Sequence, residues 1–496
     1  MGSTTTRHLR LNPLDHFPPS NYTFFCSYLP LQDNVAPDEV FNVLQESLRR
    51  TFRELPWLSG KVFPQSYSPG WRPGQLEIRY DVAEFEGNQP LRQLRINHLD
   101  PEEIGLAYQD VKESGFPLDT FRDEQLTTAE LLPNLEDGPD CLSAQANFLP
   151  GACLLVIGTQ HAACDGTSYF DVWRIWAGHC ESLQRPGAPW PDPVPAESSD
   201  RAALDRIWEK EGTGTAAVDV APESWSLLDL QRPGAPKLKA AASLKTLSDD
   251  SMQSAVFYIS PDSFTALRKR CAAGSSAHIS GNDAISALIW RCLLKAKRDA
   301  ALLAGSRVSV TAGELASADA RLFMTLDARP DISQALPLMY LGNLSVVNIC
   351  TLNANSLTSP NVSLGTVAQA IRSVVDKATT QALLDAYTLA REVDDLNKIR
   401  LNRGHTPNSF DMVLSSLLMY PVEGVTWGDG RLFANGGKPD AVRPLMGRFN
   451  RASQVCFVMP RKAHGGVEFV CNLFEEEMNL LLEDEEFGEF AMHYSY

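Results

Sequence analysis

The stretch GACLLVIGTQ, Gly151–Gln160, runs directly into HAACDG, His161–Gly166, and these sixteen residues decide the fold of the chain. The first ten are almost all apolar, which predicts a strand buried on both faces. Apolar residues then recur at helical spacing to about residue 183, and Ser168 with Asp171 resembles a capping box. A buried strand, a short turn and a helix in this order are typical of α/β proteins.

Similar units recur on both sides of this stretch. A strand is predicted within residues 13–30 and a helix at 37–53, which Pro56 follows. The second half repeats the alternation, with strands predicted at 255–259, 306–312, 321–326, 344–351 and 454–459 and helices at 262–272, 282–297 and within 364–400. The whole chain therefore predicts an α/β fold.

Composition divides the chain in two. Residues 191–250 are rich in Pro, Gly, Ala and Ser, which predicts a crossover linker. We expect an N-terminal lobe over residues 1–190, carrying the histidine motif, and a C-terminal lobe over 251–496. A length of 496 residues is compatible with this, because domains usually contain ~100–200 residues.

Charge and cysteine usage exclude several classes of protein. The chain has 44 Lys+Arg and 61 Asp+Glu, a formal net charge of −17, which disfavours nucleic acid and anionic membranes as partners. No segment reaches the ~18 apolar residues of a membrane span. The ten cysteines form no CxxC pair, which is typical of reduced thiols. We expect a cytoplasmic protein, and the absence of an oligomerisation signal favours a monomer.

His161 is the candidate catalytic residue. It follows the buried strand, so its imidazole can project into a cleft and accept a proton from an alcohol near pH 7. With nine histidines in the chain, chance alone gives about half an HxxxD match, so a satisfied core histidine stays possible on spacing alone. The sequence contains no GxSxG elbow and no HExxH motif, and we expect neither an α/β-hydrolase nor a metal site.

Five segments together resemble the HxxxD family of coenzyme-A-dependent acyltransferases. That family includes the BAHD acyltransferases, chloramphenicol acetyltransferase and the condensation domains of peptide synthetases. The opening segment is similar to fungal members of the trichothecene 3-O-acetyltransferase kind. In family order, the segments are LNPLDHFPPSNYTFFCSYLPL (Leu11–Leu31), LPWLSGKV (Leu55–Val62), HAACDG (His161–Gly166), SGNDAISALIWR (Ser280–Arg291), and LDAR with LPLMYLGN (Leu326–Asn343).

The resemblance implies two similar chloramphenicol-acetyltransferase-like lobes, with mixed β-sheets, flanking helices and an active-site tunnel between them. It implies that His161 is the general base and that Asp165 pairs with Arg329 and orders the motif loop. A buried carboxylate needs a partner, and the forked guanidinium of arginine suits it. Gly166 would leave space beside the base. The implied co-substrate is acyl-CoA, with acetyl-CoA expected first, and no metal is implied.

Two features bear on where coenzyme A would bind. Arg268, Lys269 and Arg270 form a basic cluster in the second half and are candidate phosphate ligands, although such residues are also typical of a solvated helix face. The family signature DFGWG is represented by GVTWG, Gly424–Gly428. Trp427 is kept there, and we expect it to line the cofactor site.

The sequence thus favours an enzyme that transfers an acyl group from acyl-CoA to a hydroxyl of a fungal secondary metabolite without an acyl-enzyme. The expected partners are acyl-CoA and a small-molecule alcohol. Two alternatives stay open. The altered DFGWG segment favours a fold used without coenzyme A, as an acid/base catalyst of cyclisation, dehydration or isomerisation. The other alternative is a non-catalytic metabolite-binding protein, against which the intact His161 and Asp165 argue.

Overall fold

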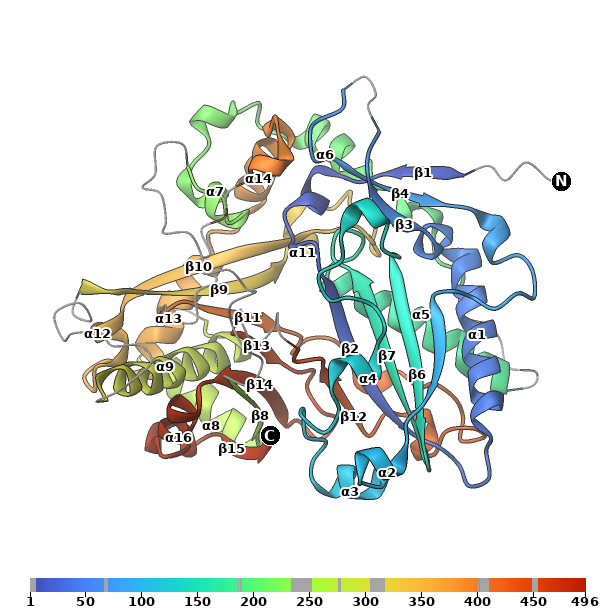
Figure 1. The fold of residues 1–496 in the computed structure, drawn as a ribbon. Coiled ribbons are helices and arrows are strands. Elements are labelled where there is room, and N and C mark those ends of the chain that lie inside the picture. The colour runs from blue at the N-terminus through green and yellow to red at the C-terminus, as the bar shows by residue number, and fades with distance from the viewer. Residues whose placement is uncertain are drawn as a thin grey trace.

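The computed structural model describes most of the chain, namely residues 6–66, 70–185, 187, 190–232, 252–274, 278–303, 317–399, 401, 410–447 and 454–496. Two lobes lie side by side, each built on a β-sheet with helices packed against it (Figure 1). Within the described ranges, the first lobe has a five-stranded sheet with a small three-stranded sheet beside it, and the second lobe has a seven-stranded sheet. The predicted α/β class and two-lobe architecture are confirmed.

The first lobe is organised by β7 (Ala152–Gln160), the apolar run that the sequence marks as a buried strand. All nine of its residues are buried, and it pairs antiparallel with β2 (Tyr22–Pro30) and β6 (Leu142–Leu149). The helices α1 (Pro37–Glu54) and α5 (Gly166–Gln184) pack together against this sheet (Figure 1). The sheet order is β12-β2-β7-β6-β5, with β5 at Leu94–His98 and β12 at Ala441–Pro444.

One strand of the first sheet comes from the second half of the sequence. Strand β12 pairs antiparallel with β2 along its whole length. Its Arg443 makes a buried ion pair of 2.8 Å with Glu468, which belongs to the second sheet. The second half of the chain is therefore tied into the first lobe by backbone pairing as well as by a buried charge pair.

The second lobe is built around α9 (Gly281–Leu302), most of whose residues are buried. Ser280 and Asp283 form the capping box at its start, as predicted. The sheet order is β10-β9-β11-β13-β14-β8-β15, with β8 at Gln253–Ile259, β9 at Asp319–Asp327, β10 at Ser345–Asn353, β11 at Met412–Ser416, β13 at Val455–Val458, β14 at Val467–Leu473 and β15 at Met492–Ser495. The helices that share its core include α8 (Pro261–Ala272), α13 (Leu364–Val375) and α16 (Glu475–Leu482).

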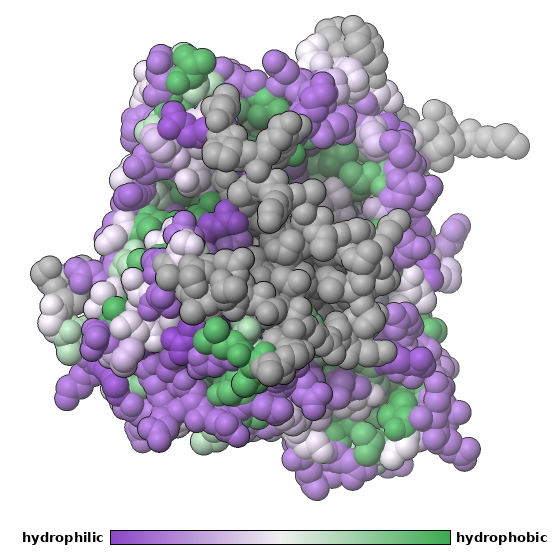
Figure 2. Space-filling view, turned by 60° about the vertical axis from the view of Figure 1, so that its left-hand side comes forward, coloured by the Kyte–Doolittle hydropathy of each residue, from purple (hydrophilic) through white to green (hydrophobic). Residues whose placement is uncertain are grey.

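The remaining described strands and α-helices are short or peripheral. They are β1 (Arg7–Arg10), β3 (Lys61–Pro64), β4 (Leu76–Tyr80), α2 (Pro101–Ile104), α3 (Tyr108–Glu113), α4 (Asp123–Leu126), α6 (Ala203–Glu211), α7 (Pro222–Leu227), α11 (Arg329–Ile332), α12 (Ala354–Thr358), α14 (Thr380–Glu392) and α17 (Glu485–Gly488). No helix in the described part of the chain has the length and hydropathy needed to cross a membrane. The coloured residues in Figure 2 are mostly hydrophilic, with scattered hydrophobic patches among them.

One local prediction is wrong, and two others fall partly or wholly outside the described residues. Helix α5 begins at Gly166 with Asp165 as its N-cap, so the predicted cap by Ser168 and Asp171 is wrong. The reason is that the Asp165 carboxylate accepts the Ser168 N–H at 2.9 Å. The segment 191–250 holds α6 and α7, which pack against α14, and its residues 233–250 lie outside the described ranges. The strand predicted at 306–312 also lies outside them.

Candidate active site

A cavity of about 620 Å³ lies between the lobes, and His161 is part of its wall. Its lining comes from β2 and the start of α5 in the first lobe and from β9, β11 and β13 in the second. Most of the lining surface is apolar, with aromatic side chains such as Phe25, Phe170 and Phe457. Pockets of this size with a few polar groups are typical of small-molecule sites. The geometry therefore places the motif histidine where a ligand of moderate size can reach it.

The backbone of the turn that carries His161 is hydrogen-bonded on all sides. The His161 N–H donates to the Asn21 carbonyl at 2.8 Å. The side-chain oxygen of Gln160 accepts the Ala162 N–H at 2.6 Å, and the Gln160 carbonyl accepts the Ala163 N–H at 2.8 Å. Strand β7 thus passes into a tight turn that leaves the imidazole half-buried at the cavity.

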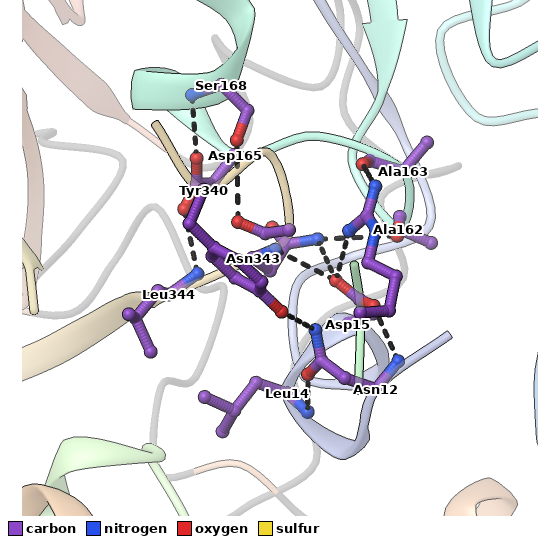
Figure 3. A network of polar contacts seen from close by, with 12 residues as sticks. Asn12, Leu14, Asp15, Ala162, Ala163, Asp165, Ser168, Tyr340, Asn343 and Leu344 are labelled. Atoms are coloured by element: carbon purple, nitrogen blue, oxygen red, sulfur yellow. Dashed lines mark hydrogen bonds and ion pairs between the residues drawn. The ribbon is translucent and has the colours of Figure 1, made fainter. Parts of the chain in front are cut away.

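Asp165 lies inside the protein and forms a bidentate ion pair with Arg329 (Figure 3 labels Asp165). Both N–H···O distances are 3.0 Å, and the Leu344 and Ser168 N–H groups donate to the same carboxylate at 2.8 and 2.9 Å. Burial alone would raise the pKa of Asp165, but the Arg329 guanidinium and these hydrogen bonds hold it below its ordinary value. The carboxylate therefore stays ionised, and its hydrogen bonds fix the conformation of the motif loop.

Arg329 joins the motif to the second lobe. Besides Asp165, its guanidinium donates to Asp327 at 2.8 Å, to the Tyr340 carbonyl at 2.9 Å and to the Gly342 carbonyl at 2.7 Å. Asp327 is the last residue of β9. Because all the nitrogens of its guanidinium donate hydrogen bonds, Arg329 fixes the positions of the carboxylates and carbonyl groups that it contacts.

A second buried cluster, which the sequence did not indicate as a site, donates hydrogen bonds to carbonyl groups of the motif turn (Figure 3). Asp15 is fully buried and accepts hydrogen bonds from Arg201 at 3.1 Å and from the Asn343 backbone and side chain, both at 2.9 Å. Arg201 also donates to the Ala163 carbonyl at 2.7 Å, and Asn343 donates to the His161 carbonyl at 2.9 Å. Two more carbonyl groups of the motif turn are thereby fixed.

Part of this cluster could have been found from the sequence. Asp15 lies in the segment LNPLDHF and Asn343 in LPLMYLGN, two of the segments that resemble the acyltransferase family. Arg201 lies in the composition-biased segment 191–250, where no periodicity or motif marks it. Its role depends on a contact across 186 residues of sequence.

The structure does not bring the predicted coenzyme A residues to the cavity. Arg268, Lys269 and Arg270 lie on the exposed face of α8, where Arg270 pairs with Glu489. They do not line the cavity, and their contact with phosphate stays a prediction.

The structure does not place Trp427 on the cavity wall, and its predicted contact with the cofactor stays a prediction. Its indole is fully buried in the core of the first lobe, 5.4 Å from the Trp176 ring and 6.2 Å from the Trp173 ring. Its carbonyl accepts a hydrogen bond of 2.6 Å from Gln184. The side chain packs between α5 and the loop after β11 and is not part of the cavity wall, because this aromatic cluster encloses it.

One group of side chains among the described residues comes close enough to hold a metal ion. It consists of Cys292, Asp484 and Glu486. Lys295 already lies 2.5 Å from Asp484 and 2.9 Å from Glu486, and Arg291 lies 2.8 Å from Glu486. These cations neutralise both carboxylates, so we assign no metal to this group.

Comparison with known proteins identifies the family. A family model described as "Transferase family" matches residues 221–488, and one described as "Trichothecene 3-O-acetyltransferase-like N-terminal domain" matches residues 21–180. The chain belongs to the transferase family. The resemblance drawn from the five sequence segments is thereby confirmed.

Curated proteins similar to this chain are named for different activities. This chain is 25% identical to an isocyanide synthase–NRPS hybrid of Aspergillus fumigatus, over 97% of this chain and 31% of the relative. It is 27% identical to an enoyl-CoA isomerase/hydratase of Penicillium crustosum over 96% of this chain and 49% of the relative. The chain thus spans half or less of these two proteins. An eremophilane O-acetyltransferase of Penicillium rubens is 24% identical over 98% of this chain and 99% of its own length.

Solved structures confirm the fold of this chain. The crystal structure of Fusarium graminearum TRI101 with coenzyme A and deoxynivalenol has a TM-score of 0.77 to this chain. The two chains are 20% identical, and the match covers 99% of this chain and 100% of the other. At this level of identity the match shows the shared two-lobe architecture.

Proposed function

We propose that this protein is an O-acyltransferase that moves an acyl group, acetyl first, from acyl-CoA to a hydroxyl of a fungal secondary metabolite. The observation that carries the proposal is the position of His161. Its imidazole lies on the wall of an interlobe cavity, and three distant segments hold its turn from behind. An acid/base residue fixed in this way next to a ligand-sized space is suited to general base catalysis.

The proposed reaction uses that position of the imidazole. His161 accepts the proton of the acceptor hydroxyl while the alcohol oxygen attacks the thioester carbonyl. The tetrahedral intermediate then expels the thiolate, which takes the proton back from the imidazolium, so that an ester and free coenzyme A thiol leave. No covalent acyl-enzyme is needed. Asp165 acts at a distance, because its carboxylate lies behind the loop in the pair with Arg329.

The acyl donor needs cations for the phosphates of coenzyme A. In the described lining of the cavity, the side chain that could meet a phosphate is the guanidinium of Arg372. It already pairs with the Asp283 carboxylate at 2.7 Å. The phosphates of coenzyme A would need cations elsewhere, and we propose the cluster Arg268–Arg270 for this role. Binding of coenzyme A to wild type and to a variant with all three residues changed to Gln, measured by calorimetry, tests this assignment.

The central experiment measures acetyl transfer from acetyl-CoA to a panel of fungal metabolite alcohols. The release of the coenzyme A thiol monitors the transfer. His161→Ala should reduce the transfer rate by about 10²–10⁴-fold without a change in Tm, because it removes the general base. His98→Ala, which alters an exposed histidine at the end of β5, serves as a matched control and should keep wild-type activity. A His161→Ala variant with near-wild-type transfer would exclude this mechanism.

The second candidate is acid/base catalysis by His161 without coenzyme A. Similarity to a protein named as an isomerase/hydratase favours it, and so does the pairing of Arg372 with Asp283. Consumption of acetyl-CoA that depends on both the acceptor and His161 would exclude this candidate. Conversion of an acceptor into an isomer or a dehydrated product without acetyl-CoA would support it.

A further inference from the structure

Three side chains form a hydrogen-bonded row on the cavity wall beside the histidine motif. The Thr167 hydroxyl donates to the Asp327 carboxylate at 2.9 Å and lies 3.2 Å from the hydroxyl of Tyr420. All three residues line the same cavity as His161. They come from the start of α5, the end of β9 and the loop after β11, so both lobes contribute to the row.

The direction of these hydrogen bonds follows from counting protons. A threonine hydroxyl has a single hydrogen, and here it goes to a carboxylate, which is the stronger acceptor. Thr167 can therefore only accept from Tyr420. The phenol uses its one hydrogen in that bond, and no other described side chain or backbone group is recorded as a partner of its oxygen. Two lone pairs of the Tyr420 oxygen are left for a ligand.

Packing holds the Tyr420 hydroxyl at this place. Its ring stacks on Phe170 with the centroids 5.4 Å apart. A Cβ atom added to Gly166 would lie 3.0 Å from the Tyr420 oxygen, so the glycine of the motif makes room for this hydroxyl. Burial raises the pKa of Tyr420 well above its ordinary value, and the phenol stays protonated at neutral pH.

We infer that Tyr420 selects acceptors which carry a second hydrogen-bond donor beside the group that is acylated. The reacting alcohol has one proton, and the proposed mechanism gives it to His161, so that proton is not available to Tyr420. The donor that Tyr420 accepts must be another O–H or N–H group. The acceptor class is therefore a diol, a polyol or an amino alcohol. This inference rests on the proposed acyl transfer and specifies its acceptor.

The test uses three matched probes with acetyl-CoA: 1,2-dodecanediol, 2-dodecanol and 1-methoxy-2-dodecanol. Wild type should prefer the diol over both mono-alcohols by about tenfold or more in kcat/KM, the value of a hydrogen bond in a site that is built to accept it. Tyr420→Phe should reduce that ratio to about twofold or less. Thr167→Val frees the Tyr420 proton, and the ratio of the methyl ether to 2-dodecanol should then rise several-fold.

The outcomes separate the inference from the proposed function. Acetyl transfer to all three probes with equal kcat/KM, or a diol preference that persists in Tyr420→Phe, would overturn the inference and leave the acyl transfer intact. Absence of transfer to these probes and to the metabolite panel would overturn the acyl transfer itself. Thermal unfolding of both variants at the wild-type Tm shows that a changed ratio does not come from a damaged fold.

Discussion

Two buried carboxylates, Asp165 and Asp15, belong to the hydrogen-bond network around the motif turn, and they are supported in different ways (Figure 3). Asp165 receives two N–H bonds from Arg329 and two from the backbone. Asp15 receives one from Arg201 and three from Asn12 and Asn343. The first carboxylate depends mainly on a charge, whereas the second depends on a set of mostly neutral donors. We expect the two sites to respond differently when their arginine is removed.

The largest effect is expected for Arg329→Met. It leaves Asp165 buried without its counter-charge, and breaking a buried ion pair in this way destabilises a protein by about 3–5 kcal/mol. Urea unfolding measures the change. Arg321→Met is a matched control, because Arg321 pairs with Asp411 nearer to solvent, and we expect at most ~1 kcal/mol there. Equal losses in the two variants would contradict the importance of the Asp165 pair.

Arg201→Met should have a smaller effect of about 1–3 kcal/mol, because Asp15 keeps three N–H donors and the Ala163 carbonyl loses one. The same unfolding measurement compares it with Arg329→Met. Arg206→Met alters an exposed ion pair near the start of α6 and should not change the Tm. A loss for Arg201→Met as large as that for Arg329→Met would show that charge, and not the number of donors, supports Asp15.

Asn343→Ala tests the residue that connects the two sides. It removes the side-chain donors to Asp15 and to the His161 carbonyl, and we expect about 1–2 kcal/mol of lost stability. If the cluster positions the imidazole, kcat for acetyl transfer should fall several-fold while KM for acetyl-CoA stays constant, and Asn343→Gln should not restore it. An unchanged kcat would limit the cluster to a structural role.

The smallest effect concerns acid stability. The pKa of Asp165 is lower in the folded protein, so its ionisation contributes stability that is complete above the unfolded value of ~3.9 and is lost as the pH falls through the folded pKa. Wild type should lose stability below pH ~4 more steeply than Asp165→Asn. Asp33→Asn removes an exposed carboxylate and controls for the change in net charge. Parallel curves for wild type and Asp165→Asn would contradict the depressed pKa.

The fold could be predicted in good part because its signals are local. The buried strand β7, the capping box of α9 and the helix α1 follow from runs and periods that each span fewer than 25 residues. The role of the His161 motif and the pairing of Asp165 with Arg329 were predicted from the family resemblance and not from spacing. Asp165 and Arg329 lie 164 positions apart in the sequence. No local pattern indicated that Trp427 would be enclosed by the side chains of α5.

By itself, the sequence determined the α/β class and the histidine at the end of a buried strand, because hydrophobic period and turn chemistry are properties of neighbouring residues. The tertiary structure alone decided that Asp15, Arg201 and Asn343 meet behind His161, and that Thr167 lies between the Asp327 carboxylate and the Tyr420 hydroxyl on the cavity wall. Those roles depend on contacts between segments far apart in the chain, where burial and the count of available protons set what each group can do.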